Sequence, residues 1–473
     1  MKSEINTYNC SSCRLKGGFF SLLLSVVRLA NSIVSKSPLS PGGGGIGWGG
    51  KLAGWTMLEP SPTPQPLYAP EGTPVNGWGA YFKNKTGQFW LLLILFFMSL
   101  MPARAVSHDS VLEAGRVAVI DLMLSDAISK GLVSGASVVI GDHEGVLYRH
   151  STGTVGFSSR SGKIKASTVF DVASLTKVFA TTPAIVKLMD EGKLSLLDPV
   201  SRWYPQFAGS EITILNLLTH TSGLKDFAIA SSNPMGSAIE KGAAQAGRVK
   251  PGSSFLYADI NFIILGDIVR RISGKTLDRF TKDEFYKPLG MKSSGFIPPP
   301  SLENAHTLGR HRIAQSGIVQ DENARRMGGV AGHAGLFSTV TDLARFSSML
   351  LNGGQLNGTR VLSARSVAQM TAPYYFSNGK IVRGLGWDRE SRYSAPKGAL
   401  FSELSFGHTG YSGTSIWVDP EVDLYVILLT TRLDYKNKKK FNRLRSDIST
   451  LAAALFSGRE RRNSVEILKN ADP

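Results

Sequence analysis

The chain has 473 residues, of which 42% are hydrophobic and 19% are charged. This length and balance permit a large hydrophobic core in one or two globular domains, and they exclude a fibrous or wholly disordered protein. The formal net charge of +17 suits nucleic acid or the anionic polymers of a cell envelope. Because the sequence has no recognisable nucleic-acid module and no interleaved basic and aromatic run, we expect no nucleic acid among its partners.

Residues 1–105 are predicted to be a leader outside the fold. Within it, residues 37–80 combine glycine-rich and proline-rich stretches, which is typical of an unstructured linker. Residues 88–105 combine an uncharged apolar run with a small-x-small end at Ala105, as a secretory signal does. The run is shorter than the roughly 20 residues of a spanning helix. We therefore expect cleavage and export to a periplasmic or extracellular site, with membrane association through residues 88–101 if the signal stays uncleaved.

Residues 106–458 carry the periodic segments of a folded domain, and residues 459–473 form a charged tail. The first predicted elements are a helix over 110–130 and a hairpin formed by 136–140 and 145–148. The later elements, which rest on apolar spacing and turn residues, are helices over 175–189, 214–218 and 344–351, strands over 414–418 and 424–430, and a helix over about 441–455.

Strands near both ends of this domain, with helices between them, predict the fold class. We expect an α/β (α+β) fold with a central antiparallel sheet made from both chain ends and flanked by helices. An all-helical subdomain is inserted at about residues 175–350. An active site would lie in the cleft between the sheet and the subdomain.

The pattern Ser-x-x-Lys occurs four times, at Ser174, Ser222, Ser377 and Ser394, and its context separates the four. Only Ser174 follows an extended-looking stretch and precedes an apolar helix. Lys177 would then lie nearly one helical turn further on, on the same face as Ser174. Backbone N–H groups at this helix end would stabilise an oxyanion. The alternative is that Ser174 only caps the helix and Lys177 is a surface charge.

A serine becomes a nucleophile only when a neighbouring group takes its proton. Lys177 can do so only as a neutral amine, and burial against the apolar helix would lower its pKa. The sequence therefore predicts Ser174 as nucleophile and Lys177 as its base.

Four segments in order resemble the motifs of the class C β-lactamase superfamily, which includes penicillin-binding proteins, D-alanyl-D-alanine carboxypeptidases and related esterases. They are Ser174-Leu175-Thr176-Lys177, Leu217 to Leu224, Tyr257-Ala258-Asp259 and His408-Thr409-Gly410. The resemblance spans roughly residues 110–457 and implies a β-lactamase/transpeptidase-like fold.

By this resemblance, Tyr257 shuttles protons beside Ser174 and forms a coupled pair with Lys177. The alternative role for Tyr257 is a core tyrosine. Asp259 is the substrate-binding position where many members carry asparagine. An asparagine amide donates to a substrate carbonyl, whereas a carboxylate can only accept. We therefore expect altered recognition of substrate amides.

The third motif supplies the substrate strand. His408 replaces the lysine of the family pattern, and a histidine is charged only part of the time near neutral pH. The resemblance implies that Thr409 binds a substrate carboxylate and that Gly410 leaves room for the substrate. The backbone N–H of Tyr411 would be the second oxyanion donor beside that of Ser174.

Other candidates are weaker. His220 lies in a family-like segment that usually packs, and the glycine-dense residues 328–335 lack the ending of a phosphate loop. His311, His333 and His408 lack metal-ligand spacing, so we expect no metal and no cofactor.

The sequence thus predicts a serine hydrolase that cleaves β-lactam, D-alanyl peptide or ester bonds through a covalent Ser174 acyl-enzyme. Its partner would be a small molecule or a peptidoglycan peptide. The alternatives are a penicillin-binding or peptidoglycan-binding receptor without turnover and, third, a metallohydrolase.

Overall fold

A computed structural model of the chain describes residues 108–158, 160–308, 314–391, 393 and 396–457. The predicted leader with its signal segment, the charged tail and His311 lie outside the described residues. Among the helices that are described, none is long and apolar enough to cross a membrane.

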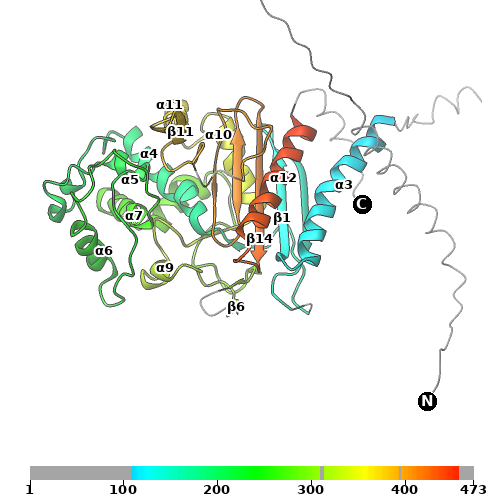
Figure 1. The fold of residues 1–473 in the computed structure, drawn as a ribbon, viewed down its shortest axis with the longest axis horizontal. Helices are drawn as coiled ribbons and strands as arrows, with labels where there is room; N and C mark the ends of the chain where they lie inside the picture. Colours follow the sequence, from blue (N-terminus) through cyan, green and yellow to red (C-terminus); the bar gives the residue numbers. More distant parts are fainter. Residues whose placement is uncertain (1–107, 159, 309–313, 392, 394–395, 458–473) are drawn as a thin grey trace, which may run out of the picture. The chain divides into compact units, whose positions relative to one another are not determined.

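The centre of the domain is a five-stranded antiparallel sheet with strand order β12-β13-β14-β1-β2 (Figure 1). Its strands are β1 Val133–Gly141, β2 Val146–Gly153, β12 Phe406–Thr409, β13 Ser415–Asp419 and β14 Leu424–Arg432. The first and last segments meet where β1 pairs with β14, with Val139 opposite Ile427. This pairing confirms a sheet built from both chain ends.

Helices cover both faces of the sheet, as β-strand alternation requires. On one face, Val138 and Ile140 pack with α3 (His108–Ser129) and α12 (Lys438–Phe456). On the other face, Val139 packs in the main core, where α10 (Val340–Leu351) lies against β1 and β14. Figure 1 shows α3 in blue and α12 in red beside the strands.

The middle of the chain is mainly helical. Its helices beyond α10 are α4 Thr182–Asp190, α5 Ile214–Leu218, α6 Pro234–Ala243, α7 Asp259–Ser273, α8 Leu277–Thr281, α9 Glu322–Arg326 and α11 Ala364–Thr371. The predicted helical subdomain is therefore present, but it is not all-helical, because short strands occur within it and beside it. They are β3 Phe170–Asp171, β4 Gly295–Phe296, β5 Thr307–Leu308, β6 Ala314–Gln315, β7 Leu336–Ser338, β8 Gln355–Leu356, β9 Thr359–Arg360, β10 Tyr375–Ser377 and β11 Lys380–Arg383. β7 pairs with the distant β3 and β4, whereas β5 with β6, β8 with β9 and β10 with β11 form local hairpins.

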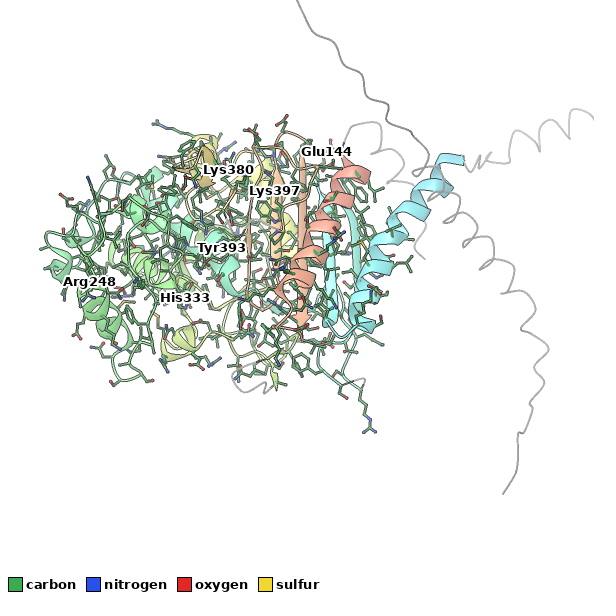
Figure 2. All side chains as sticks on the ribbon, viewed as in Figure 1. Glu144, Arg248, His333, Lys380, Tyr393 and Lys397 are labelled. Atoms are coloured by element: carbon green, nitrogen blue, oxygen red, sulfur yellow. The ribbon has the colours of Figure 1, made fainter. Side chains whose placement is uncertain are left out.

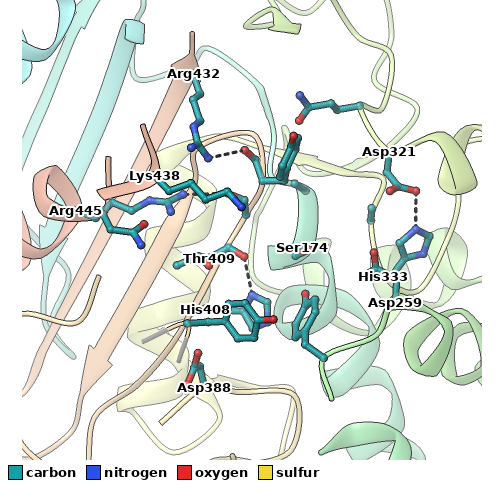
Figure 3. A pocket seen from close by; sticks show the side chains of 18 of the residues that line it. Ser174, Asp259, Asp321, His333, Asp388, His408, Thr409, Arg432, Lys438 and Arg445 are labelled. Atoms are coloured by element: carbon teal, nitrogen blue, oxygen red, sulfur yellow. Dashed lines mark hydrogen bonds and ion pairs between the residues drawn. The ribbon is translucent and has the colours of Figure 1, made fainter. Parts of the chain in front are cut away.

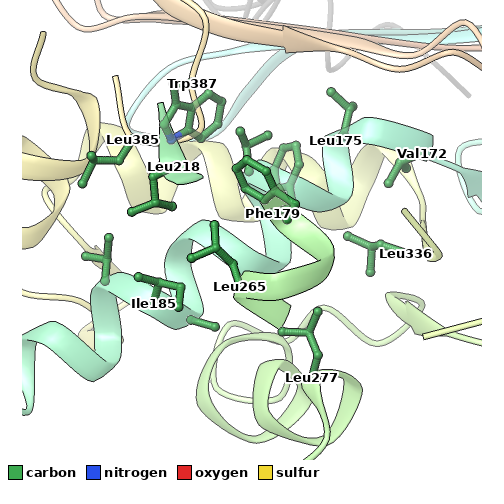
Figure 4. Close-up of a cluster of buried hydrophobic side chains, with 14 of the residues drawn as sticks. Val172, Leu175, Phe179, Ile185, Leu218, Leu265, Leu277, Leu336, Leu385 and Trp387 are labelled. Atoms are coloured by element: carbon green, nitrogen blue, oxygen red, sulfur yellow. The ribbon is translucent and has the colours of Figure 1, made fainter. Parts of the chain in front are cut away.

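Aromatic rings join the helical subdomain to the sheet layer (Figure 4). Phe179 contacts Phe346 of α10 with ring centroids 5.0 Å apart and Trp387 at 6.4 Å. Trp387 in turn meets Phe406 of β12 at 4.9 Å. Complete burial of such side chains contributes about 1.5–3 kcal/mol each. This core holds the helix after Ser174 in a fixed position against the strand that carries His408.

The predicted helix over 175–189 is present as one uninterrupted run of helical backbone, but its hydrogen-bond pattern changes along the run. Ala173–Leu175 is a 3-10 turn, Lys177–Thr181 is a π-helical turn, and α4 begins at Thr182. Pro183 has no N–H to donate to the carbonyl four residues back, on Phe179. The hydroxyl of Tyr286 donates to that carbonyl instead, at 3.2 Å. The change in hydrogen bonding is therefore local and compensated.

Candidate active site

One cavity of about 670 Å³ brings the predicted motifs together. Figure 3 shows side chains converging on it from the sheet, from α12 and from the helical subdomain. In Figure 2, His333 and Tyr393, which both line it, lie near the middle of the domain. The predicted residues along the cavity are Ser174, Tyr257, Asp259, His408, Thr409, Gly410 and Tyr411, and other lining residues include Asp321, His333, Arg383, Asp388, Tyr393, Arg432, Lys438 and Arg445.

Lys177 is fully buried next to the nucleophile position. Its Nζ lies 3.2 Å from Ser174 Oγ. Nζ also donates to Asp259 Oδ1 at 2.7 Å and to the backbone oxygen of His333 at 3.0 Å. These contacts occupy the three hydrogens of an ammonium group. The spacing of Ser174 and Lys177 therefore produces the predicted proximity, with the lysine fully hydrogen-bonded.

The predicted charge state of Lys177 is wrong. Burial lowers the pKa of Lys177, as expected, but the Asp259 carboxylate and Tyr257 outweigh burial and hold this pKa above its usual value. Lys177 is therefore an ammonium ion in the resting protein. Asp259 is the first residue of α7, where the helix dipole favours a negative charge.

Tyr257 is held between the lysine and a buried histidine. Lys177 Nζ lies 5.0 Å from the centre of the Tyr257 ring. On the other side, the ring of His220 stacks on that of Tyr257 with centroids 4.4 Å apart. His220 Nδ1 accepts from the backbone N–H of Ala258 at 3.2 Å. Burial raises the pKa of Tyr257, while the charge of Lys177 opposes that rise. His220 thus orients the tyrosine.

The glycine-dense loop 328–335 is part of the site. Its Gly332 approaches α7 so closely that a Cβ there would overlap the backbone oxygen of Phe262. Next to it, His333 is buried, and its Nε2 lies 2.7 Å from Asp321 Oδ1. Burial raises the pKa of Asp321, but the hydrogen bond with His333 outweighs it and holds that pKa well below normal. The loop therefore places the carbonyl that fixes Lys177.

The turn after β12 is tied to the strand before the nucleophile. Ser412 Oγ donates to the backbone oxygen of Asp171 at 2.8 Å, and Thr414 Oγ1 donates to that of Val172 at 2.9 Å. A Cβ on Gly410 would lie 2.6 Å from the same oxygen of Val172. Gly410 is thus required for this packing, where the sequence predicted only room for a substrate.

The backbone around both expected oxyanion donors is unusual. Ala173, which precedes the nucleophile, has a φ of 50°, a strained value for a residue with a side chain. Among the described residues, no backbone oxygen accepts from the N–H of Tyr411. Tyr411 lines the cavity, so its N–H is a candidate donor to an oxyanion.

Two buried arginines hold the same turn. Arg445 Nη2 donates to the backbone oxygens of Gly410 at 3.0 Å and Thr414 at 2.6 Å. Arg432 reaches the oxygen of Tyr411 at 3.5 Å. Both arginines line the cavity, yet their hydrogen bonds go to the protein backbone. They are supports of the turn.

A family model described as β-lactamase matches residues 120–448. The chain belongs to the β-lactamase family. A protein of Escherichia coli (strain K12), provisionally named a D-alanyl-D-alanine carboxypeptidase, is 30% identical to it over 398 residues, which cover 74% of this chain and 91% of that protein. The chain is thus a serine hydrolase of the β-lactamase type.

Solved structures share its fold. The octameric penicillin-binding protein homologue from Pyrococcus abyssi matches with a TM-score of 0.56 and 24% identity, covering 67% of this chain and 73% of that chain. A class C β-lactamase matches with a TM-score of 0.59 and 20% identity, covering 73% of this chain and 98% of that chain. These matches confirm the predicted β-lactamase/transpeptidase-like fold.

At the position of the lysine in the β-lactamase-family strand pattern, His408 is uncharged. Burial, with the nearby charges of Arg383 and Lys177, holds the pKa of His408 well below normal. Its Nδ1 lies 2.9 Å from the backbone oxygen of Thr409, while its buried Nε2 has no hydrogen-bond partner in the described part of the chain. His408 therefore supplies no cation to a substrate at neutral pH.

Asp259, Asp321 and His333 offer ligand atoms within 4.8 Å of one another, a spacing that could hold a metal ion. Lys177 already donates to Asp259. An added cation would compete with this ammonium group for the same carboxylate and would be repelled by it. The residues present therefore fit a β-lactamase-type proton network better than a metal centre.

Several site residues escaped the sequence analysis. Arg383, Asp388 and Arg445 stand outside the family-like motifs, and only contacts between distant segments bring them to the cavity. His333 gave a partial signal, because its glycine-dense surroundings indicated a loop packed near the cleft. No sequence motif indicated that Asp321 belongs to the site.

Proposed function

We propose that this member of the β-lactamase family cleaves D-alanyl peptide bonds through a Ser174 acyl-enzyme, as a carboxypeptidase-type hydrolase. The observation that carries the proposal is the contact of Lys177 Nζ with both Ser174 Oγ, at 3.2 Å, and Asp259 Oδ1, at 2.7 Å. The name of the Escherichia coli relative supports a D-alanyl peptide as the substrate class.

Acylation begins from the ammonium form of Lys177. Lys177 passes one proton to Asp259, and the lone pair so exposed accepts the proton of Ser174 as Oγ adds to the substrate carbonyl carbon. The backbone N–H groups of Ser174 and Tyr411 hold the oxyanion. When the carbon–nitrogen bond breaks, the leaving nitrogen takes a proton from Lys177 by way of the Tyr257 hydroxyl. Asp259 then returns its proton to the lysine.

Deacylation repeats these steps with water. Water adds to the acyl carbon and gives its proton to Lys177 through Tyr257, while Asp259 again receives a lysine proton. Cleavage of the ester carbon–oxygen bond passes the proton from Lys177 to Ser174 Oγ, and Asp259 then returns its proton to Lys177. The products are a shortened peptide acid and the free serine.

We also propose export of the protein, because D-alanyl peptides belong to the cell wall. The support is the signal-like sequence of residues 88–105. Cell fractionation with N-terminal sequencing of the mature protein tests this. Export with a new N-terminus just after Ala105 is expected, and a cytoplasmic protein with an intact leader would contradict the proposal.

One observation favours a second function, a penicillin-binding receptor that acylates without turnover. Lys177 forms an ion pair with Asp259 at 2.7 Å, and this carboxylate outweighs burial to keep the pKa of Lys177 above its usual value, which disfavours a neutral amine. If the transfer of its proton to Asp259 fails in the acyl-enzyme, the ester would persist.

Intact-mass spectrometry of the full chain separates the two functions. The chain is mixed with an N-acylated D-alanyl-D-alanine and, separately, with a penicillin, and Ser174→Ala is the control. Peptide turnover that Ser174→Ala abolishes supports the hydrolase. A lasting penicillin adduct without peptide turnover supports the receptor, and equal behaviour of both proteins would overturn both proposals.

A further inference from the structure

Asp171 carries a buried carboxylate that takes no part in the proton transfers at Ser174. The residue lies in β3, shortly before the nucleophile, and is only 2% exposed. Both of its oxygens accept from backbone, Oδ1 from the N–H of Ala173 at 2.8 Å and Oδ2 from the N–H of Gln320 at 2.7 Å. Asp171 does not line the catalytic cavity in the described structure, so any effect on the reaction passes through these neighbours.

The hydrogen bond to Ala173 holds the backbone next to the nucleophile. Ala173 has a φ of 50°, which is unfavourable for a residue with a side chain and persists only where the surroundings impose it. An aspartate that accepts from the N–H two residues further on stabilises a local turn. Because the N–H of Ser174 follows directly, the same turn sets the direction of this oxyanion donor.

The hydrogen bond to Gln320 links the same carboxylate with the lysine. Gln320 directly precedes Asp321, whose Oδ1 lies 2.7 Å from Nε2 of His333 (Figure 3). The backbone oxygen of His333 in turn accepts from Lys177 Nζ at 3.0 Å. The Asp171 carboxylate therefore anchors both the nucleophile turn and the segment that fixes Lys177.

The charged groups around Asp171 leave it without a direct ion pair in the described structure. Burial is the largest effect and, with the charge of Asp321, disfavours the carboxylate, whereas the two backbone hydrogen bonds and the charge of Arg325 favour it. The balance raises the pKa of Asp171 to about 6. The phenol of Tyr435 is also within electrostatic reach. Protonation places an O–H donor against one of the two backbone N–H groups, so that hydrogen bond is lost.

We propose that Asp171 is a positioning residue whose ionised carboxylate holds the nucleophile turn and the lysine-fixing segment in register, and whose protonation releases one of them. The hydrolase is thus active at neutral pH and loses activity in mild acid while it stays folded. This inference rests on the proposed Ser174 hydrolase function.

The effect of Asp171 on stability has the opposite sign to its effect on activity. Because burial raises the pKa of Asp171 in the folded chain, the folded state binds this proton more tightly than the unfolded state does. The resulting stabilisation is complete below the usual pKa of an aspartate, ~3.9, and is lost as the pH rises through about 6. Protonation of Asp171 therefore does not unfold the protein.

The test is the pH profile of kcat between pH 5 and 8 with a neutral nitrophenyl ester. In the wild type, kcat should fall about tenfold between pH 7.5 and 5, since one pH unit below a pKa leaves about a tenth of the carboxylates ionised. Asp171→Asn keeps the shape of the protonated carboxyl. It should be roughly 10- to 100-fold slower at pH 7.5, because misplacement by about 1 Å can cost about 100-fold. It should show no step near pH 6 and an unchanged KM.

Asp342→Asn is the matched control. Asp342 is 6% exposed, accepts from the backbone N–H of Ser293 at 2.7 Å, and also has a pKa that burial raises. It lies in α10 and does not line the cavity in the described structure. Its substitution should lower the melting temperature and keep the wild-type pH profile of kcat.

The outcomes separate the inference from the function beneath it. A wild-type profile without a step near pH 6, or a step that persists in Asp171→Asn, would overturn the inference and leave the hydrolase intact. So would a loss of near-ultraviolet circular dichroism in the wild type that parallels the fall in kcat. No turnover and no Ser174 adduct with ester or penicillin would overturn the proposed function itself.

A second variant decides if Asp171→Asn does not fold. The charge of Arg325 favours the Asp171 carboxylate, so Arg325→Gln should move the step in kcat to higher pH. A step that stays in place would overturn the inference. If the wild type is acylated without turnover, the same profiles are measured from the rate of adduct formation.

Discussion

Lys177 and Arg383 are two buried cations beside one cavity, and the protein treats them in opposite ways. Lys177 uses its three hydrogens on Ser174, Asp259 and His333. Arg383 makes one long hydrogen bond and leaves its Nε without a partner among the described residues. A fully hydrogen-bonded buried charge is held in one position, whereas an unsatisfied one lowers the stability of the folded chain. The contrast shows that burial alone does not tell how firmly the protein fixes a charged group.

The largest effect should come from removing the fully bonded cation. Lys177→Ala deletes the proton carrier and leaves Asp259 without its ion pair, so acylation should fall by about 10⁴-fold, the upper range for acid–base catalysis. Rapid-mixing mass spectrometry of the acyl-enzyme measures this. Lys187→Ala, on α4 and partly exposed, is the control and should acylate normally. Normal acylation in Lys177→Ala would remove the basis of the mechanism.

Asp259→Asn tests whether the Asp259 carboxylate accepts the lysine proton or only restrains Lys177. Burial lowers the pKa of Lys177, while Asp259 and Tyr257 raise it, so removal of Asp259 should lower that pKa. Without an acceptor for the lysine proton, acylation at pH 7 should fall about 10²-fold. It should then recover as the pH rises through the lowered lysine pKa and neutral amine appears. A faster reaction than wild type at pH 7 would mean that Asp259 only restrains the lysine. Asp283→Asn, in an exposed ion pair with Lys275, is the control.

Arg445→Gln tests whether Arg445, which donates to backbone oxygens, affects the reaction by positioning the turn after β12. The variant loses charge-assisted bonds to Gly410 and Thr414, which should cost about 1.5–3 kcal/mol of unfolding free energy. Because the Tyr411 N–H then becomes less fixed, kcat should fall about tenfold with little change in KM, as for an interaction made in the transition state. Arg443→Gln, on the same helix and 81% exposed, should change neither. A rise in KM alone would instead indicate direct substrate binding by Arg445.

The smallest effect is expected from one of the hydroxyl ties. Thr414→Val removes the bond to Val172 while Ser412 still holds the turn. We expect a loss of about 1 kcal/mol in chemical unfolding and a change in acylation below roughly fivefold. Loss of acylation comparable to that of Lys177→Ala would show that the turn depends on a single bond.

The sequence predicted what local patterns encode. Ser174, Lys177 and Tyr257 lie in short motifs, and the strands and α12 follow from apolar spacing, so their positions agree with the structure. The charge of Lys177 could not be predicted, because it depends on the distance to Asp259, 82 residues further along the chain. The π-helical turn before α4 had a local signal in Pro183, but the hydrogen bond from Tyr286, 107 residues from Phe179, did not.

The hydrogen bonding of Arg383 could not be predicted from the sequence either. Nothing in its neighbouring residues distinguishes it from Arg389, six positions later, which is also buried. The difference lies in their acceptors, which other parts of the chain supply to Arg389 and withhold from Arg383. The sequence around a buried arginine therefore does not tell whether its donors are satisfied, because the acceptors come from distant segments.

The ties from Ser412 and Thr414 to the strand before Ser174 join residues 241 and 242 positions apart. During synthesis, the nucleophile, its lysine and its tyrosine therefore emerge long before the turn that completes the oxyanion site. That turn is held only once β13 and β14 have formed and β14 has paired with β1. We therefore expect the nascent chain to have no hydrolase activity until nearly the whole domain has been made. A chain truncated before β12 should be inactive, not weakly active.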